Sequence, residues 1–408
     1  MYTGSKQRAY AAAMESLLYE PLTKHDAELN TFIKFEKTNI NKAPRIINPR
    51  STRYTLELAR YLKKLEKPVF SAINSCFRSK SSHTVIKGLN VYDSAAAIRA
   101  KWDRFTDPIA ISGDITKLDM HVSRAALEYE HSIYNRIFRS RRLKRLLSWQ
   151  LLNTGRAYFK DGSVSFSMQG TRSSGDINTS LGNVIIVCSI LYAYTQGTGV
   201  CVELLNNGDD FCFILERKDY HQLDGLPEFF EECGMPLKME PPVDEFERIV
   251  FCQTQPVYDG RRWRMVREIR TCLRKDTICT VDVHTRESLR QWLHAVGSGN
   301  GVITTGIPML QSFYAMFRRL GLPAGASMYQ RAFKNTSMWE RTHGVGDAIY
   351  TEVTQDARYS FYVATGIVSD VQISFEHIFD SVTTLEEVDC LSETIGASIL
   401  NNETYLIN

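Results

Sequence analysis

Several features that would assign the chain to a familiar class are absent from its sequence. The nine cysteines never occur as Cys-x-x-Cys and never stand beside paired histidines, so we expect neither a zinc site nor a disulfide framework. This cysteine usage fits a reducing compartment. The longest apolar run, Val184 to Tyr194, is too short to span a bilayer. Signal peptides and lipidation motifs are also missing. The 408 residues could build two or three core-sized units or one large multi-subdomain enzyme, and because no internal repeat or low-complexity linker divides them, we do not expect separate domains joined by linkers.

Charge is distributed unevenly along the chain. The apolar share of 43% over 408 residues is ordinary for a folded protein, and the net charge is only +3. Residues 32–80 nevertheless hold twelve lysines and arginines against three acids, and residues 136–156 hold seven with no acid. Residues 376–393 reverse the balance with six acids. Such asymmetry indicates a basic lining for a polyanion.

The stretch Asn206-Asn207-Gly208-Asp209-Asp210 carries a strong local signal. Asn-Gly between two apolar runs predicts a tight hairpin, because both central positions of such a turn need positive φ. The hairpin would hold Asp209 and Asp210 at its tip, where their oxygens suit Mg²⁺. An ordinary solvated turn has the same short pattern.

A second set of carboxylates follows a short apolar strand, residues 108–113. Asp114 and Asp119 stand five residues apart across a predicted strand-to-helix turn, so both would face one cleft. They could otherwise serve as a helix cap and a solvated turn residue. The helix after them is predicted to bury one face, made of Val122, Ala126, Tyr129, Ile133 and Ile137.

A polar loop, residues 173–180, feeds a helix that is apolar nearly all round from Leu181 to Leu191. Backbone N–H groups and hydroxyls at such a junction suit a phosphate or a ribose. A plain N-cap region would look alike.

The basic segment at residues 30–50 alternates in the manner of a strand. Its cations would line a channel while Phe32, Ile33 and Phe35 face a core. An exposed edge strand defended by Lys and Arg is the alternative.

The other expected elements are read from periodicity and turn signals. We predict helices at residues 10–18, 55–66 and 220–234, strands at 237–240 and 248–253, and hairpins around Asp161-Gly162 and Asp259-Gly260. Helices dominate from about residue 265, and a loop at residues 297–301 is predicted to break them; it matches neither a Walker A nor a Rossmann fingerprint.

The order of these elements places Asp114 and Asp209 on neighbouring strands of one antiparallel sheet. Phosphoryl transfer with two Mg²⁺ ions needs that arrangement, because the metals clamp the attacking and leaving oxygens. A basic channel and a sugar-reading loop would complete a nucleotidyl-transfer site.

With these residues in place, the chain resembles the RNA-dependent RNA polymerases of positive-strand RNA viruses, most closely those of the tombusvirus family. The resemblance covers most of the chain, in order, and is weaker over the last hundred residues. One departure is Met120, where relatives usually carry Gln. The resembling segments are residues 32–53 (basic fingertip motif), 114–123, 170–183, 207–210, 234–240 and 251–256 (five palm motifs) and 306–308 (thumb).

The resemblance implies an α+β right-hand fold, with fingers, a palm built on an antiparallel sheet and a helical thumb, closed by fingertips. The implied divisions are fingers and fingertips at 1–107, first palm part at 108–130, fingers insertion at 131–164, second palm part at 165–262 and thumb at 263–408.

It also implies roles for individual residues. Asp114 and Asp209 would hold two Mg²⁺ ions (Mn²⁺ as substitute), with Asp210 in support and Lys238 protonating the pyrophosphate. The ribose 2′-OH would be recognised by Asp119, Ser174, Thr179 and Asn183. The triphosphate would be neutralised by Lys34, Lys42 and Arg45. RNA would contact Lys37, Arg50, Arg53, Phe251, Cys252 and Gln253.

The implied partners are an RNA template, its product and ribonucleoside triphosphates, with replicase or host factors beside them, and initiation de novo is favoured. We expect the chain to be the C-terminal part of a longer replicase that works in the host cytoplasm on membranes, anchored by regions or partners outside this chain. Two other readings stay open. A reverse transcriptase shares the palm but generally carries an aromatic where Gly208 stands and a bulky gate where Asp119 stands. A non-catalytic RNA-binding scaffold fits the basic segments equally well.

Overall fold

The computed structural model describes residues 4–39, 41–77, 83–334, 336, 338–387 and 405–407. Four charged residues of the sequence patterns lie outside that part: Arg78, Lys80, Asp389 and Glu393. Two compact units mix helices and sheets. Met1–Lys34, Pro44–Val85 and Gly113–Glu240 make the first unit, and Phe35–Ala43, Ile86–Ser112 and Pro241–Asn408 make the second.

The first unit is built on two four-stranded sheets, with orders β7-β8-β4-β9 and β3-β1-β5-β6. Strand β4 (Pro108–Ile115) enters it from the second unit. Its other elements are α1 (Gly4–Tyr19), η1 (Lys24–Ala27), β1 (Leu29–Ile33), β3 (Ile46–Ile47), α2 (Thr52–Leu62), η2 (Lys63–Leu65), α3 (Glu66–Cys76), α5 (Leu118–His121), α6 (Arg124–Phe138), α7 (Arg141–Ser148), β5 (Leu152–Phe159), β6 (Gly162–Gln169), α8 (Thr179–Thr198), β7 (Val202–Asn206), β8 (Asp210–Glu216), η3 (Arg217–Leu223), α9 (Leu226–Glu232) and β9 (Leu237–Met239).

Two hairpins confirm the turn signals in this unit. Strands β5 and β6 pair around Asp161-Gly162, and β7 and β8 pair around the Asn-Gly turn. The helix predicted to be apolar all round is α8, whose residues from Leu181 to Cys188 are all buried. The helix predicted at residues 220–234 is shorter: it begins at Leu226, with a 3-10 turn before it.

Helix α6 buries a different face from the predicted one. Tyr129 is 48% exposed and Ile137 is 51% exposed. The residues that α6 buries are Leu127, Glu130, His131 and Tyr134. The apolar periodicity was therefore misleading, because two polar side chains occupy the inner face.

The apolar side chains of the basic segment also lie elsewhere than expected. Phe32, Ile33 and Phe35 are 52%, 47% and 58% exposed, so they do not face a core. Strand β1 pairs with β5 on one edge and with the two-residue β3 on the other, and of its residues only Leu29 is buried.

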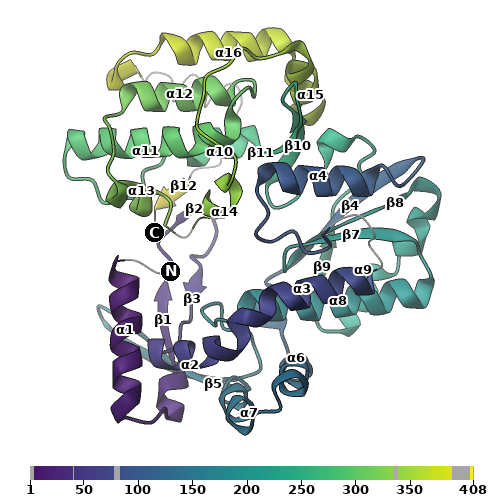
Figure 1. The fold of residues 1–408 in the computed structure, drawn as a ribbon, viewed down its shortest axis with the longest axis vertical. Coiled ribbons are helices and arrows are strands. Elements are labelled where there is room, and N and C mark those ends of the chain that lie inside the picture. Colours follow the sequence, from purple (N-terminus) through teal and green to yellow (C-terminus); the bar gives the residue numbers. More distant parts are fainter. Residues whose placement is uncertain are drawn as a thin grey trace. The chain divides into compact units, whose positions relative to one another are not determined.

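The second unit is mostly helical (Figure 1). Its core lies between α11, α12 and α16 and includes Trp292, Phe313 and Phe379. The elements are β2 (Lys37–Asn39), α4 (Val91–Trp102), η4 (Phe246–Arg248), β10 (Thr254–Tyr258), β11 (Trp263–Arg267), α10 (Ile269–Lys275), α11 (Arg286–Thr304), α12 (Leu310–Leu320), α13 (Ala326–Ala332), α14 (Met338–Thr342), α15 (Gln355–Thr365), α16 (Ser369–Ser381) and β12 (Tyr405–Ile407). Strands β10 and β11 confirm the hairpin around Asp259-Gly260.

Two predictions in the second unit are wrong. The glycine-rich stretch 297–301 is no loop but the continuous interior of α11. A Cβ on Gly297 would stand 2.7 Å from the carbonyl oxygen of Tyr314 and 2.8 Å from the nitrogen of Arg318, so glycine lets α12 approach closely. Residues 248–253 form no strand either: Cys252 and Gln253 turn the chain with φ of 52° and 59°.

None of the helices in the described residues combines the length and apolarity needed to cross a membrane.

Candidate active site

Asp114 stands on the solvent side of β4. Its neighbours Gly113 and Ile115 are buried, and Asp114 between them is exposed, as strand alternation requires. A Cβ on Gly113 would collide with the ring of Phe211, the second residue of the adjacent strand β8. Glycine therefore lets β8 pack against β4 at this point, which brings the start of β8 to the end of β4.

Asp209 lies in the turn that precedes β8. The last pair of the hairpin is Asn206 with Phe211, so the loop has four residues, and the Asn207 N–H donates to the carbonyl of Asp210 at 2.9 Å. Only Gly208 has positive φ here, at 98°. The hairpin prediction is confirmed, but its detail is wrong, because a longer loop needs fewer left-handed residues than the two-residue turn.

The buried side chain of Asn206 stabilises this turn through hydrogen bonds to its backbone. The residue has no exposed surface, and its amide nitrogen donates to the carbonyl of Gly208 at 3.0 Å and to that of Asp210 at 3.4 Å. Its amide oxygen accepts from the Gly208 N–H at 3.0 Å. The side chain thus fixes the backbone on both sides of Asp209.

Asn206→Ala is expected to lower the free energy of unfolding by about 1–3 kcal/mol, since it leaves the Gly208 N–H buried without a partner. Urea unfolding measures this change. Asn30→Ala, which removes the same side chain from an exposed site on β1, is the matched control and should change stability little. Equal effects of the two substitutions would contradict the bracing role of Asn206.

The carboxylates at this edge repel one another. Partial burial and then the charge of Asp209 raise the pKa of Asp114 above its usual range. Burial also raises the pKa of Asp119, and Asp209 adds to that effect. Asp209 therefore lies within electrostatic reach of both other acids. Negative groups gathered in this way favour a bound cation.

Lys238 stands opposite Asp114 in the pairing of β4 with β9. Its ammonium donates to Glu240 Oε1 at 2.7 Å, and this hydrogen bond is the main cause of a raised pKa of Lys238. The lysine is exposed and lies near Asp114, where its charge opposes the rise in the pKa of Asp114.

The predicted ribose-binding residues separate into two groups. Asn183 Nδ2 donates to Asp119 Oδ1 at 2.9 Å, so these two side chains do lie together. Thr179 Oγ1 instead donates to the carbonyl of Ser173 at 2.8 Å, and the hydroxyl of Ser174 is buried without a protein partner. The loop therefore uses Thr179 to hold its own shape.

A buried ion pair behind Asn183 was missed in the sequence. Arg172 Nε donates to Asn183 Oδ1 at 3.1 Å, and its Nη2 pairs with Glu130, whose side chain has no exposed surface. Glu130 escaped notice because the wrong face of α6 was predicted to be buried. A charged residue at helical spacing from Leu127 and Tyr134 was the available signal.

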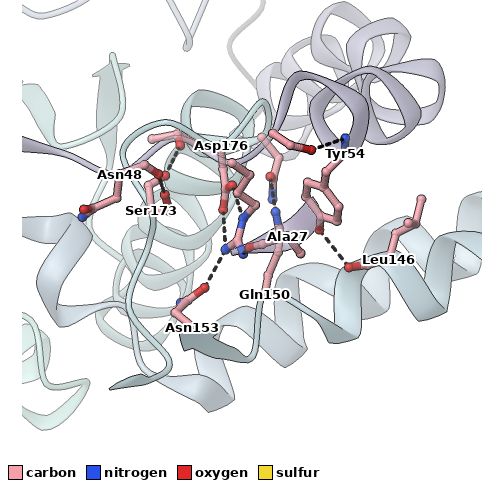
Figure 2. A network of polar contacts seen from close by, with 12 residues as sticks. Ala27, Asn48, Tyr54, Leu146, Gln150, Asn153, Ser173 and Asp176 are labelled. Carbon is pink, nitrogen blue, oxygen red and sulfur yellow. Dashed lines mark hydrogen bonds and ion pairs between the residues drawn. The ribbon is translucent and has the colours of Figure 1, made fainter. Parts of the chain in front are cut away.

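Arg50, a predicted RNA contact, is buried and hydrogen-bonded within the protein. Its side chain is 1% exposed and its Nε donates to Asp176 Oδ1 at 2.6 Å. Its guanidinium also donates to Asn153 Oδ1 and to the carbonyl of Ala27. Figure 2 labels Asp176, Asn153 and Ala27, which accept these hydrogen bonds from the Arg50 guanidinium. It also shows Ser173, whose hydroxyl donates a hydrogen bond to the carbonyl of Asn48. The basic segment is thereby clamped to the polar loop.

Other predicted cations are also engaged within the protein. Arg53 donates to Asp26 at 2.9 Å and to Ser16 at 2.7 Å, which ties α2 to α1. In the second unit, Lys37 donates to the carbonyl of Lys275, and burial lowers the pKa of Lys37. Arg45 acts on the site electrostatically: its charge opposes the rise in the pKa of Asp119.

The remaining predicted residues are placed as follows. Lys34 is half-buried in the first unit, and its backbone N–H donates to the carbonyl of Arg45 at 2.8 Å. Lys42 belongs to the second unit and is exposed. Phe251 is 2% exposed, so its ring is buried, while Cys252 is half-buried and Gln253 is exposed.

Asp114 and Asp209 offer the oxygen ligands that Mg²⁺ prefers. No group of three or more His, Cys, Asp or Glu side chains is gathered closely enough for a metal ion in the described residues. Asp210 therefore does not complete a protein-only cage. Asp114 and Asp209 alone would suit an ion that keeps part of its coordination shell outside the protein, as Mg²⁺ usually does.

Known proteins resemble this chain over most of its length. The family model described as viral RNA dependent RNA polymerase matches residues 1–387. The RNA-directed RNA polymerase of Cucumber necrosis virus is 38% identical over 385 residues, which cover 93% of this chain and 46% of that protein. Those of Tobacco necrosis virus (strain A) and Tomato bushy stunt virus (strain Cherry) are also 38% identical, over 93% and 92% of this chain and 53% and 46% of their own lengths. The chain spans about half the length of the relatives it matches, and it belongs to the viral RNA-dependent RNA polymerase family.

Proposed function

We propose that the chain copies an RNA template into RNA during replication of a positive-strand RNA virus. The observation that supports this proposal is that Asp209, in the turn before β8, lies close enough to Asp114 on the neighbouring strand β4 to raise the pKa of Asp114. Family membership and the RNA-directed RNA polymerase activity for which the relatives are named support it. A scaffold that only bound RNA would gain nothing from such repulsion beside a polyanion.

Asp114 and Asp209 would hold two Mg²⁺ ions, with Asp210 in support and Mn²⁺ as a substitute. The ions supply charge neutralisation at the attacking and leaving oxygens when they are bound. The protein's own contribution is positioning and electrostatics. Lys34, Lys42 and Arg45 are assigned to the triphosphate, and Lys238 to the departing pyrophosphate, where it would exchange its hydrogen bond with Glu240 for one to phosphate.

The right-hand arrangement is part of the same proposal, with fingers at 1–107 and 131–164, palm at 108–130 and 165–262, and thumb at 263–408. Closure by fingertips is supported by Lys37, which lies in the unit that holds residues 241–408 and donates to the carbonyl of Lys275. De novo initiation, and location on host cytoplasmic membranes through regions outside this chain, complete the proposal.

Primer-free synthesis on a defined RNA template with Mg²⁺ tests the proposal. Ribonucleoside triphosphates are expected to be incorporated in preference to deoxyribonucleoside triphosphates by at least about 100-fold, since a site that hydrogen-bonds a hydroxyl rejects an analogue without it. Preference for deoxyribonucleotides would favour the reverse transcriptase reading. RNA binding without incorporation of either would favour the scaffold.

A further inference from the structure

The side chain of Asn183 faces two partners that require opposite ends of its amide. Its Nδ2 donates to Asp119 Oδ1 at 2.9 Å, and its Oδ1 accepts from Arg172 Nε at 3.1 Å. A flipped amide would set its nitrogen against the Arg172 N–H and its oxygen against the Asp119 carboxylate. Arginine can only donate, so Arg172 permits one orientation of Asn183.

Arg172 is itself held in place by a buried anion. Its side chain is 1% exposed and pairs with Glu130 Oε2. The other oxygen of Glu130 accepts from the hydroxyl of Tyr134 and from Asn178 Nδ2, each at 2.8 Å. Gln150 then donates to Asn178 Oδ1 at 3.0 Å. Glu130 thus accepts hydrogen bonds from Arg172, Tyr134 and Asn178, and its ion pair with Arg172 holds the guanidinium beside Asn183.

The backbone of helix α8 packs against this ion pair at Gly182, the residue before Asn183. A Cβ on Gly182 would collide with Arg172 Nη2 and with Glu130 Oε1, so the helix backbone lies directly against both charges. Arg172 also reaches Asp119 through the main chain, because its N–H donates to the carbonyl of Asp119 at 2.7 Å. One residue thus fixes the backbone of Asp119 and, through Asn183, the side chain of Asp119.

We propose that Arg172, anchored by Glu130, is a positioning residue for ribose selection: it fixes the amide of Asn183 so that the carboxylate of Asp119 is kept as an acceptor facing the sugar hydroxyls. The inference rests on the proposed function. It adds a control of specificity that never touches the nucleotide, since Arg172 and Glu130 are both buried behind Asn183.

Arg172→Lys tests this role, because lysine keeps the charge opposite Glu130 but lacks the planar fork that reaches Asn183 as well. The measurement is kcat and KM for ATP and for dATP on one RNA template. We expect the KM for ATP to rise while the kcat/KM for dATP stays constant. The preference for ATP over dATP should therefore fall about 10-fold, which corresponds to the loss of one hydrogen bond to a charged group. In an Asn183→Ala background, Arg172→Lys should cause no further loss.

A purely structural role of Arg172 would lower the use of both nucleotides equally and leave their ratio unchanged, which would overturn the inference. Glu130→Gln, which keeps the size of the side chain that pairs with Arg172 but removes its charge, is measured in the same assay. Urea unfolding identifies which variants are folded. Unchanged selectivity in a folded variant contradicts the role. Failure of the wild-type protein to incorporate either nucleotide would instead overturn the proposed function, so the two failures are distinct.

Discussion

Asp209→Asn is expected to lower ribonucleotide incorporation on an RNA template by on the order of 10³-fold, a loss typical of removing a main electrostatic stabiliser of the transition state. The amide keeps the size of the side chain and removes the charge that a cation would need. Asp114→Asn should have an equal effect, because the two acids act on one site. Initial rates at saturating Mg²⁺ measure both. Asp224→Asn, an exposed acid of the same unit, is the control and should retain the wild-type rate.

Metal binding offers a second readout that does not depend on activity. Mg²⁺ at ten times its dissociation constant should raise the free energy of unfolding of the wild-type protein by about 1.4 kcal/mol. It should not stabilise Asp209→Asn. Because the pKa of Asp114 is raised, protons compete with the cation, and the Mg²⁺ effect should weaken as pH falls through that raised value. Equal stabilisation of both proteins by Mg²⁺ would mean that Asp209 is not a ligand.

The acidic half of the site could be predicted because its signals are local. An Asn-Gly turn between apolar runs, and a strand that ends in Asp114, each determine a backbone shape within about ten residues. The sheet order then brings the two strands together, since β8 and β4 are neighbours. Because the aspartate side chain is short, the backbone at a turn or at a strand end largely determines the direction of its carboxylate.

The basic half could not be predicted in the same way. Arg50 and Asp176 are separated by 126 positions, and nothing near Arg50 in the sequence indicates an acid that it would meet. Long cationic side chains can reach partners in many directions, so the charge density of the segment does not tell which cations are buried in ion pairs, as Arg50 is, and which are exposed, as Arg45 is. The loop predicted at residues 297–301 was wrong for a related reason. The glycines there allow the close approach of α12, which cannot be read from the sequence of α11 alone.

Arg50→Met is expected to lower the free energy of unfolding by about 3–5 kcal/mol, because it leaves the buried carboxylate of Asp176 without its counter-charge. Asn153 Oδ1 and the carbonyl of Ala27 lose their donor as well. Urea unfolding measures the change. Arg45→Met, which removes an exposed cation from the same basic segment, is the matched control and should have little effect on stability.

The double variant Arg50→Met/Asp176→Leu separates the ion pair from the packing around it. Removing both charges leaves no uncompensated carboxylate, so much of the lost stability should return. A role in RNA binding predicts the opposite pattern: Arg50→Met would then unfold like the wild-type protein and lose affinity for RNA, and Asp176→Leu would restore nothing. Because the polar loop carries Ser174 and leads into α8, the ion pair of Arg50 with Asp176 also fixes the basic segment to the loop that is predicted to recognise the ribose.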